Sequence, residues 1–170
     1  ENIAALEPQF DAIAEALTDR LVAKKQFEFM ADFCTPFAGQ AICTLLGLPL
    51  DNWLSVASDA SDLGLAMGVE CKRHEATYNA ACDRLMTLAD TMISKARTGQ
   101  GDGAYVARLV AAFDAEAGLE EQHLRDLVVI STFGGVDTTR SQLGLAIGQF
   151  IAHPDQWQLL RENESLAGQA

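Results

Sequence analysis

Apolar residues recur at spacings of three and four along most of the chain. The first apolar stripe consists of Ile3, Leu6, Phe10, Ile13, Leu17 and Leu21. This spacing places the stripe on one face of an amphipathic helix, and the alternation typical of β-strands never persists. The same periodicity predicts further helices at about 36–46, 51–63, 71–97, 105–113 and 155–163, with Thr35 and Asp51 as N-caps of the first two. The pattern therefore predicts an all-α fold.

The segment from Leu119 to Ala152 contains no proline and predicts a single helix. It would hold roughly 34 residues and extend about 50 Å at a rise of 1.5 Å per residue. Its middle is apolar on nearly every side, which is typical of a helix that is buried on every side. We therefore predict one domain over residues 1–170, with a long central buried helix surrounded by five to seven helices.

The middle of this apolar helix contains several residues that local rules disfavour there. Gly134 and Gly135 each cost about 1 kcal/mol relative to alanine in a helix interior. Asp137 needs a partner or solvent in an apolar setting, and the hydroxyls of Thr138 and Thr139 compete for backbone carbonyls. Such a cluster is typical of a functional or strained site. The alternative is helix packing, in which the glycines admit a neighbouring helix and Asp137 simply reaches solvent.

The candidate site residues share one face of the predicted helix. At about 100° per residue, that face carries Ile130, Phe133, Gly134, Asp137 and Thr138. This face then presents, in order, two apolar side chains, a position without a side chain at Gly134, and the polar pair Asp137 and Thr138. A bulky planar ligand and a small gas molecule could both lie against such a strip.

Composition and charge limit the partners. The formal net charge is -12, so the chain has little means of neutralising phosphates, and we expect no nucleic-acid partner and no anionic membrane surface. No signal sequence and no run of about 18 apolar residues occurs, which favours a cytoplasmic protein. No spacing of histidine, cysteine or carboxylate residues resembles a metal site. The four cysteines form no Cys-x-x-Cys pair and are expected to be small, mostly buried residues: Cys34, Cys43, Cys71 and Cys82.

Two ordered segments resemble a known family. Phe133-Gly134-Gly135-Val136-Asp137-Thr138-Thr139, followed by Ala152-His153-Pro154-Asp155-Gln156-Trp157, resembles the central helix and the next helix of a soluble bacterial cytochrome P-450, a haem-thiolate monooxygenase. Upstream, Phe27-Glu28-Phe29-Met30 and Leu45-Leu46-Gly47-Leu48-Pro49 resemble the segments that lead into and out of an earlier helix of that family. The resemblance implies a partial cytochrome P-450 fold.

The resemblance also implies roles for the central motif. Gly134 and Gly135 would mark the local widening of the helix where dioxygen lies above the haem. Thr138 would be the threonine whose hydroxyl holds water and delivers protons during oxygen activation. Asp137 would be its acidic neighbour, which relays protons from solvent.

The surroundings of that motif follow from the same resemblance. Ile130 and Phe133 would pack against the haem or the substrate, and residues 63–69 would form part of a substrate lid. The cofactors would be haem and O2. The substrate would be a small organic molecule, and electrons would come from NAD(P)H through a ferredoxin-type donor.

The chain departs from the family pattern in one important respect. None of its cysteines lies in the Phe-x-x-Gly-x-x-x-Cys loop that supplies the iron ligand in this family. We therefore expect a fragment of a monooxygenase that is inactive alone. The alternative is a stand-alone helical binding protein derived from that fold, which would self-associate, for instance as a homodimer, by hiding Ile130 and Phe133.

Overall fold

The structure is a computed structural model that describes residues 4–100 and 104–169. Seven α-helices make up most of this part of the chain: α1 (Glu7–Val22), α2 (Thr35–Leu46), α3 (Trp53–Gly64), α4 (Glu75–Arg97), α5 (Ala104–Asp114), α6 (Glu121–Ala152) and α7 (Pro154–Glu162). Short 3-10 turns and one π-helical turn, Met30–Cys34, join them. The described residues contain no strand, so the predicted all-α fold is confirmed.

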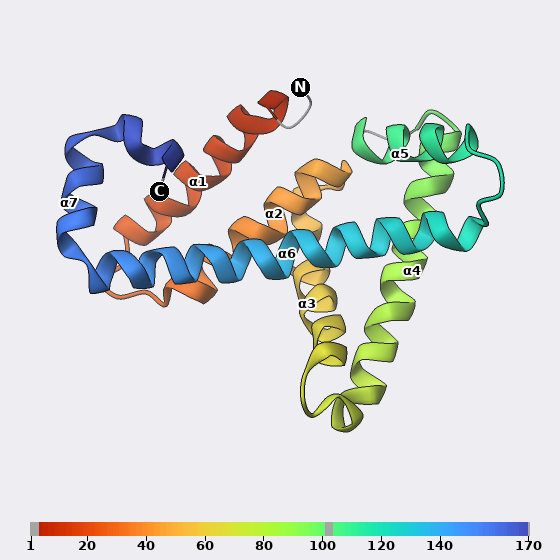
Figure 1. The fold of residues 1–170 in the computed structure, drawn as a ribbon, viewed down its shortest axis with the longest axis horizontal. Helices are drawn as coiled ribbons and strands as arrows, with labels where there is room; N and C mark the ends of the chain where they lie inside the picture. Colours follow the sequence, from red (N-terminus) through yellow and green to blue (C-terminus); the bar gives the residue numbers. More distant parts are fainter. Residues whose placement is uncertain (1–3, 101–103, 170) are drawn as a thin grey trace.

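Helix α6 runs through the whole molecule and contacts most of the other helices (Figure 1). The hydrophobic core lies where α2, α3, α4 and α6 cross. It includes Ile42 of α2, Leu85 of α4, and Val128 and Val136 of α6, all nearly inaccessible to solvent. The arrangement is the predicted one, a long central helix with the other six helices around it.

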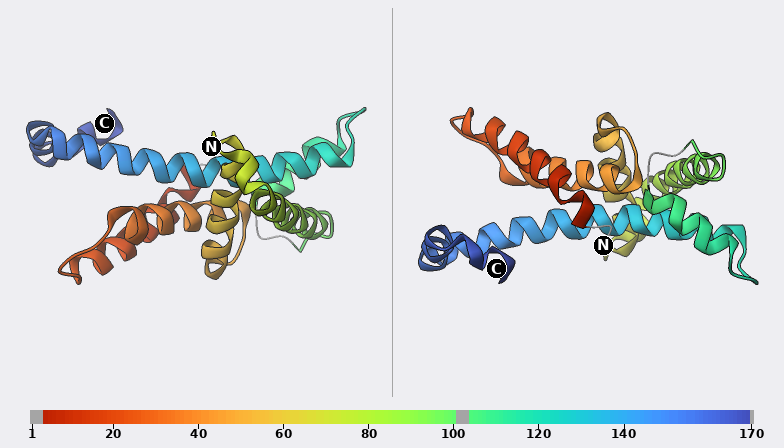
Figure 2. Two further views of the ribbon diagram at one scale, coloured as in Figure 1. Left: turned by 90° about the horizontal axis from the view of Figure 1, so that it is seen from below. Right: turned by 90° about the horizontal axis from the view of Figure 1, so that it is seen from above.

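One face of α6 differs from the prediction that the helix is buried on every side. Figure 2 shows that α1 and α2 lie to one side of α6. Leu127 is 44% exposed and Ile130 is 64% exposed. Gly134 and the exposed Thr138 continue this face, and Leu145 is 62% exposed further along. We call these five residues the open strip. The sequence could not reveal the strip because Leu127, Ile130 and Leu145 are as apolar as the buried residues of the same helix.

The start of α6 also differs from the prediction. The helix begins at Glu121 rather than Leu119, because Glu120 is extended and acts as the N-cap. His123 completes a capping box: its Nδ1 atom accepts a hydrogen bond from the Glu120 N–H at 2.9 Å. This reciprocal arrangement satisfies two backbone donors that would otherwise lack partners.

The predicted N-caps of two earlier helices are wrong. Thr35 lies inside a continuous helical segment, because the π-helical turn Met30–Cys34 leads directly into α2. Asp51 lies in a 3-10 turn, and α3 begins two residues later at Trp53 without a side-chain cap. The predicted end of α2 is correct, since Gly47 adopts a left-handed conformation with φ of 73°.

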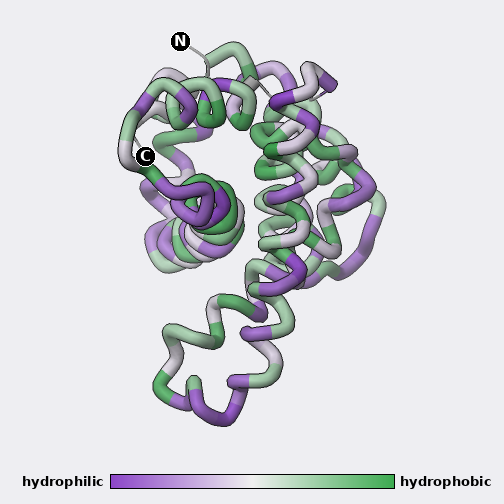
Figure 3. The backbone as a smooth tube through the Cα atoms, turned by 90° about the vertical axis from the view of Figure 1, so that its right-hand side faces the viewer, coloured by the Kyte–Doolittle hydropathy of each residue, from purple (hydrophilic) through white to green (hydrophobic). Residues whose placement is uncertain are grey.

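Helices α3 and α4 form a hairpin whose tip, residues 65–74, projects away from α6 (Figure 1). Figure 3 shows both hydrophobic and hydrophilic positions at this tip. Met67 is 74% exposed and Val69 is fully exposed. Arg84 of α4 donates a hydrogen bond to Asp59 of α3 at 2.8 Å and ties the two helices together. The segment expected to be a lid therefore occupies a protruding turn.

The cysteines differ in burial and should differ in reactivity. Cys34 and Cys43 are fully buried, whereas Cys71 and Cys82 are half-buried. Burial raises the pKa of Cys34 and raises that of Cys43 to about 11. Because the thiolate is the reactive form, we expect a maleimide at pH 8 to modify Cys71 and Cys82 in the folded chain. Cys34 and Cys43 should react only after denaturation, as peptide mass spectrometry would show. Rapid modification of Cys43 in the folded chain would contradict this packing.

Candidate functional site

The two adjacent glycines of α6 have different surroundings. A Cβ atom on Gly135 would lie 2.6 Å from Cδ1 of the buried Ile42 in α2, so this glycine permits a close helix crossing. A Cβ atom on Gly134 would meet nothing within 4 Å. Packing therefore accounts for Gly135, whereas in the described part of the chain it does not account for Gly134.

Alanine at these two positions should have opposite effects on stability. At Gly134 the free energy of unfolding should rise by about 0.5–1 kcal/mol, because alanine is the better helix former and has room. At Gly135 it should fall by about 1 kcal/mol, because the overpacking cost exceeds that gain. Urea denaturation of the two variants would measure both values. Equal effects would contradict the assignment of Gly135 alone to the α2 crossing.

Thr138 lies on the open strip, one helical turn beyond Gly134. Its side chain is exposed, and its hydroxyl donates a hydrogen bond to the Gly134 carbonyl. Threonine in a helix often bonds to the carbonyl four residues earlier, and this contact weakens the backbone ladder locally. The hydroxyl therefore lies directly beside the gap at Gly134 and can still accept a hydrogen bond.

Asp137 lies at the edge of the strip and has a cationic partner. Its Oδ1 atom lies 2.5 Å from Nη2 of Arg140, one turn further along α6. The Asp137 side chain is 38% exposed, so it also reaches solvent. Arg140 in turn donates a hydrogen bond from Nη1 to Oγ of Ser61 in α3, at 2.9 Å. In this structure the carboxylate and the Thr138 hydroxyl therefore have different partners.

The motif in the sequence points to Asp137 but not to the two residues that hold it, Arg140 and Ser61. The spacing of an acid and an arginine three residues apart on a helix is a usable signal for Arg140. No sequence signal points to Ser61, which lies 79 positions before Arg140.

The structure separates Ile130 from Phe133. Ile130 is on the open strip. Phe133 instead lies against the end of α3, where a Cβ atom on Gly64 would be 3.3 Å from its ring. The predicted shared face is thus divided: Ile130, Gly134 and Thr138 lie together, with Phe133 on the α3 side.

The open strip fits one side of a flat apolar group. It offers exposed aliphatic side chains and, at Gly134, a position without a side chain. It does not offer an iron ligand, because the four cysteines lie elsewhere: in the π-helical turn, α2, the hairpin tip and α4. Among the described residues, no three histidine, cysteine or carboxylate side chains gather closely enough to hold a metal ion. The open strip therefore suits one side of a flat apolar group but supplies no thiolate.

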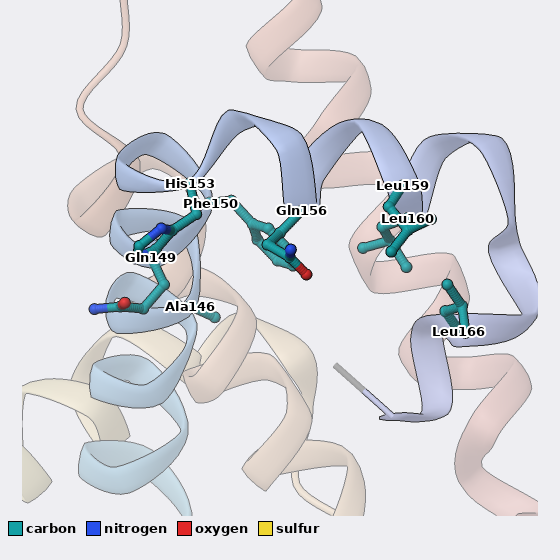
Figure 4. Close-up of a pocket in the computed structure, with 8 residues that line it drawn as sticks. All are labelled: Ala146, Gln149, Phe150, His153, Gln156, Leu159, Leu160 and Leu166. Atoms are coloured by element: carbon teal, nitrogen blue, oxygen red, sulfur yellow. The ribbon is translucent and has the colours of Figure 1, made fainter.

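A hollow lies between the end of α6, α7 and the last 3-10 turn (Figure 4). Its volume is about 470 Å³. Phe150, Leu160 and Leu166 make much of its lining apolar, and His153 lies at the α6–α7 junction. The lining begins at Ala146, about two helical turns beyond Thr139, and includes no residue of the glycine–threonine cluster, so we assign the hollow no part in that site.

Comparisons with known proteins define the family. No protein-family model matches the chain. It is 32% identical over 171 residues to luteothin monooxygenase of Streptomyces thioluteus. The aligned part makes up 99% of this chain and 41% of that protein. It is 26% identical to cytochrome P450 107B1 of Saccharopolyspora erythraea, over 97% of this chain and 39% of the relative.

A solved structure agrees with these relatives. The LnmA cytochrome P450 hydroxylase of Streptomyces atroolivaceus superposes with a TM-score of 0.80 at 25% identity, over 96% of this chain and 41% of that one. No described helix is long and apolar enough to cross a membrane. The chain spans about 40% of the length of the relatives it matches. Sequence and fold together show that the chain belongs to the bacterial cytochrome P450 family and matches a helical part of its members.

Proposed function

We propose that the full-length protein containing this chain is a haem-dependent monooxygenase that inserts one oxygen atom of O2 into a small organic substrate. The observation that carries the proposal is the gap at Gly134 beside the Thr138 hydroxyl, on an open apolar face of the central helix. The family relation supports the same reaction, since relatives named as monooxygenase and hydroxylase match nearly the whole chain.

The residues of α6 would provide the proton-delivery half of the active site. Ile130 and Gly134 would lie against one face of the haem, and the missing side chain at Gly134 would leave room for dioxygen. When bound, haem would bind dioxygen and pass to it the electrons that an external donor provides. Asp137 would take a proton from solvent, and the Thr138 hydroxyl would pass it on through its own hydrogen bond. Because one oxygen atom leaves as water, each turnover needs two such transfers.

Other parts of the reaction depend on partners outside this chain. We propose that electrons come from NAD(P)H through a ferredoxin-type donor and that the protein works in the cytoplasm. A cysteine thiolate outside these 170 residues would bind the iron, because the open strip offers none.

Carbon monoxide spectroscopy tests this proposal. The full-length protein, loaded with haem and reduced, should give a Soret band at the thiolate position when exposed to CO. This 170-residue chain, treated in the same way, should not. A full-length protein without a thiolate-type band would contradict the proposed function, and a thiolate-type band from this chain alone would contradict the assignment of the iron ligand.

A second function is favoured by the exposed aliphatic side chains of α6. Leu127, Ile130 and Leu145 are each between 44% and 64% exposed. Exposed aliphatic side chains gathered on one face of a helix are typical of a binding surface. We propose that the isolated chain self-associates through this face. An Ile130→Glu variant should shift the sedimentation profile towards the monomer, and a strictly monomeric wild-type chain at high concentration would contradict the proposal.

A further inference from the structure

Asp137 is joined to α3 through Arg140. The guanidinium of Arg140 uses two different nitrogens: Nη2 contacts Asp137 Oδ1 at 2.5 Å, and Nη1 donates to Ser61 Oγ at 2.9 Å. Its side chain is 26% exposed, less than that of Asp137 at 38%. The planar fork of arginine suits it to hold two partners in a fixed geometry. The carboxylate is therefore attached to a second helix as well as to its own.

A second contact fixes α3 against α6 at the same level. Phe133 lies one turn before Asp137, and its ring packs beside Gly64, one turn after Ser61. The polar and apolar contacts therefore lie on both sides of Asp137 along α6. Together they determine which part of α3 faces Arg140.

We propose that Arg140 is a positioning residue for Asp137 and that Ser61 anchors it. This role rests on the proposed function of Asp137 as the proton-accepting group. Asp137 and Thr138 are successive residues, about 100° apart around the helix. Arg140 holds the carboxylate on the α3 side of the strip, where Asp137 is still 38% exposed to solvent. Without Arg140, the carboxylate has no fixed orientation from which to begin proton transfer.

NMR of the arginine side chains tests the attachment without haem and without turnover. In the wild-type chain, hydrogen bonds at both Nη atoms should slow rotation about the Nε–Cζ bond, so that the Arg140 Nη signals are resolved. The signals should merge in Ser61→Ala and in Asp137→Asn. The Arg140→Lys variant has no guanidinium at this position, so the signals that disappear from its spectrum are those of Arg140. Resolved signals that persist in both variants would overturn the proposed anchoring.

Turnover of the full-length enzyme tests the positioning role. Arg140→Gln should lower kcat about tenfold with little change in KM, because misplacing a reacting group costs rate rather than binding. Arg140→Lys should recover part of the loss, since an ammonium can still pair with Asp137. In an Asp137→Asn background, Arg140→Gln should have no further effect. If Arg140→Gln lowered kcat by the same factor in the Asp137→Asn background as in the wild-type enzyme, the proposal would be overturned.

A matched control removes a different ion pair from the same helix. Arg125 of α6 lies 2.5 Å from Asp90 of α4 and is 38% exposed. Arg125→Gln should leave kcat unchanged, which separates positioning from general support of α6. If Asp137→Asn alone had no effect on turnover, the proposed proton relay would fail, while the NMR result would still decide whether the attachment exists.

Discussion

Thr138→Ala in the full-length enzyme should lower the fraction of consumed NAD(P)H that yields oxygenated product by about 100-fold, the range typical of a lost proton donor. Oxygen would still be reduced, because electron supply does not depend on Thr138, but the electrons would leave as hydrogen peroxide. Peroxide formed per NAD(P)H oxidised measures this effect. The fold should be retained, because alanine is a better helix former and, in the described structure, the hydroxyl bonds only to the Gly134 carbonyl.

Two variants control for this result. Thr138→Ser keeps a hydroxyl in place and should keep most of the product yield. Thr139→Ala removes a neighbouring hydroxyl that lies on another side of the helix and should have little effect on the yield. Equal peroxide formation in Thr138→Ala and Thr139→Ala would contradict a specific role for Thr138.

Gly39→Ala should cause a large loss of stability. Gly39 is buried where α2 crosses the start of α3. A Cβ atom there would lie 2.9 Å from the Trp53 carbonyl oxygen and 3.1 Å from its ring. Because backbone cannot rotate away as a side chain can, we expect the free energy of unfolding to fall by about 2–3 kcal/mol.

Urea denaturation would measure this loss against Gly148→Ala. Gly148 is also inside a helix, but it is exposed and a Cβ atom there would meet nothing within 4 Å. The free energy of unfolding of that variant should rise by about 0.5–1 kcal/mol, because alanine is a better helix former than glycine. A Gly39→Ala variant as stable as the wild-type chain would show that the α2–α3 crossing is looser than described.

The sequence predicted the features of the fold that depend on local periodicity. Apolar spacing identified the helices, and the proline-free run that closes just before Pro154 placed the end of α6 correctly at Ala152. The motif around Gly134–Thr139, in order with the segment that follows it, resembled a known family, and the relatives confirm that family. These signals lie within a few residues of one another and need no tertiary information.

The remaining features depend on tertiary contacts. Leu127 and Ile130 are as apolar as Val128, so the sequence could not show which of them is exposed. Gly134 and Gly135 are the same residue type in the sequence. They differ only in the structure, where the side chain of Ile42 packs against Gly135 and not against Gly134.

The attachment of Asp137 to α3 is the clearest example of such a contact. Arg140 could be suspected from its spacing, but its bond to Ser61 joins residues 79 positions apart. The crossing of α3 and α6 creates this contact, and no local pattern encodes it.

The central claim is that the gap at Gly134 lies where a small gas molecule binds, and the CO affinity of the reduced full-length enzyme tests it most directly. A leucine at Gly134 should fill the gap at a steric cost of about 2 kcal/mol, which corresponds to an approximately 30-fold weaker affinity for CO. Gly148→Leu lies on the same exposed face, several turns away, and should leave the affinity unchanged. An unchanged CO affinity in Gly134→Leu, with the thiolate-type Soret band retained, would contradict the account.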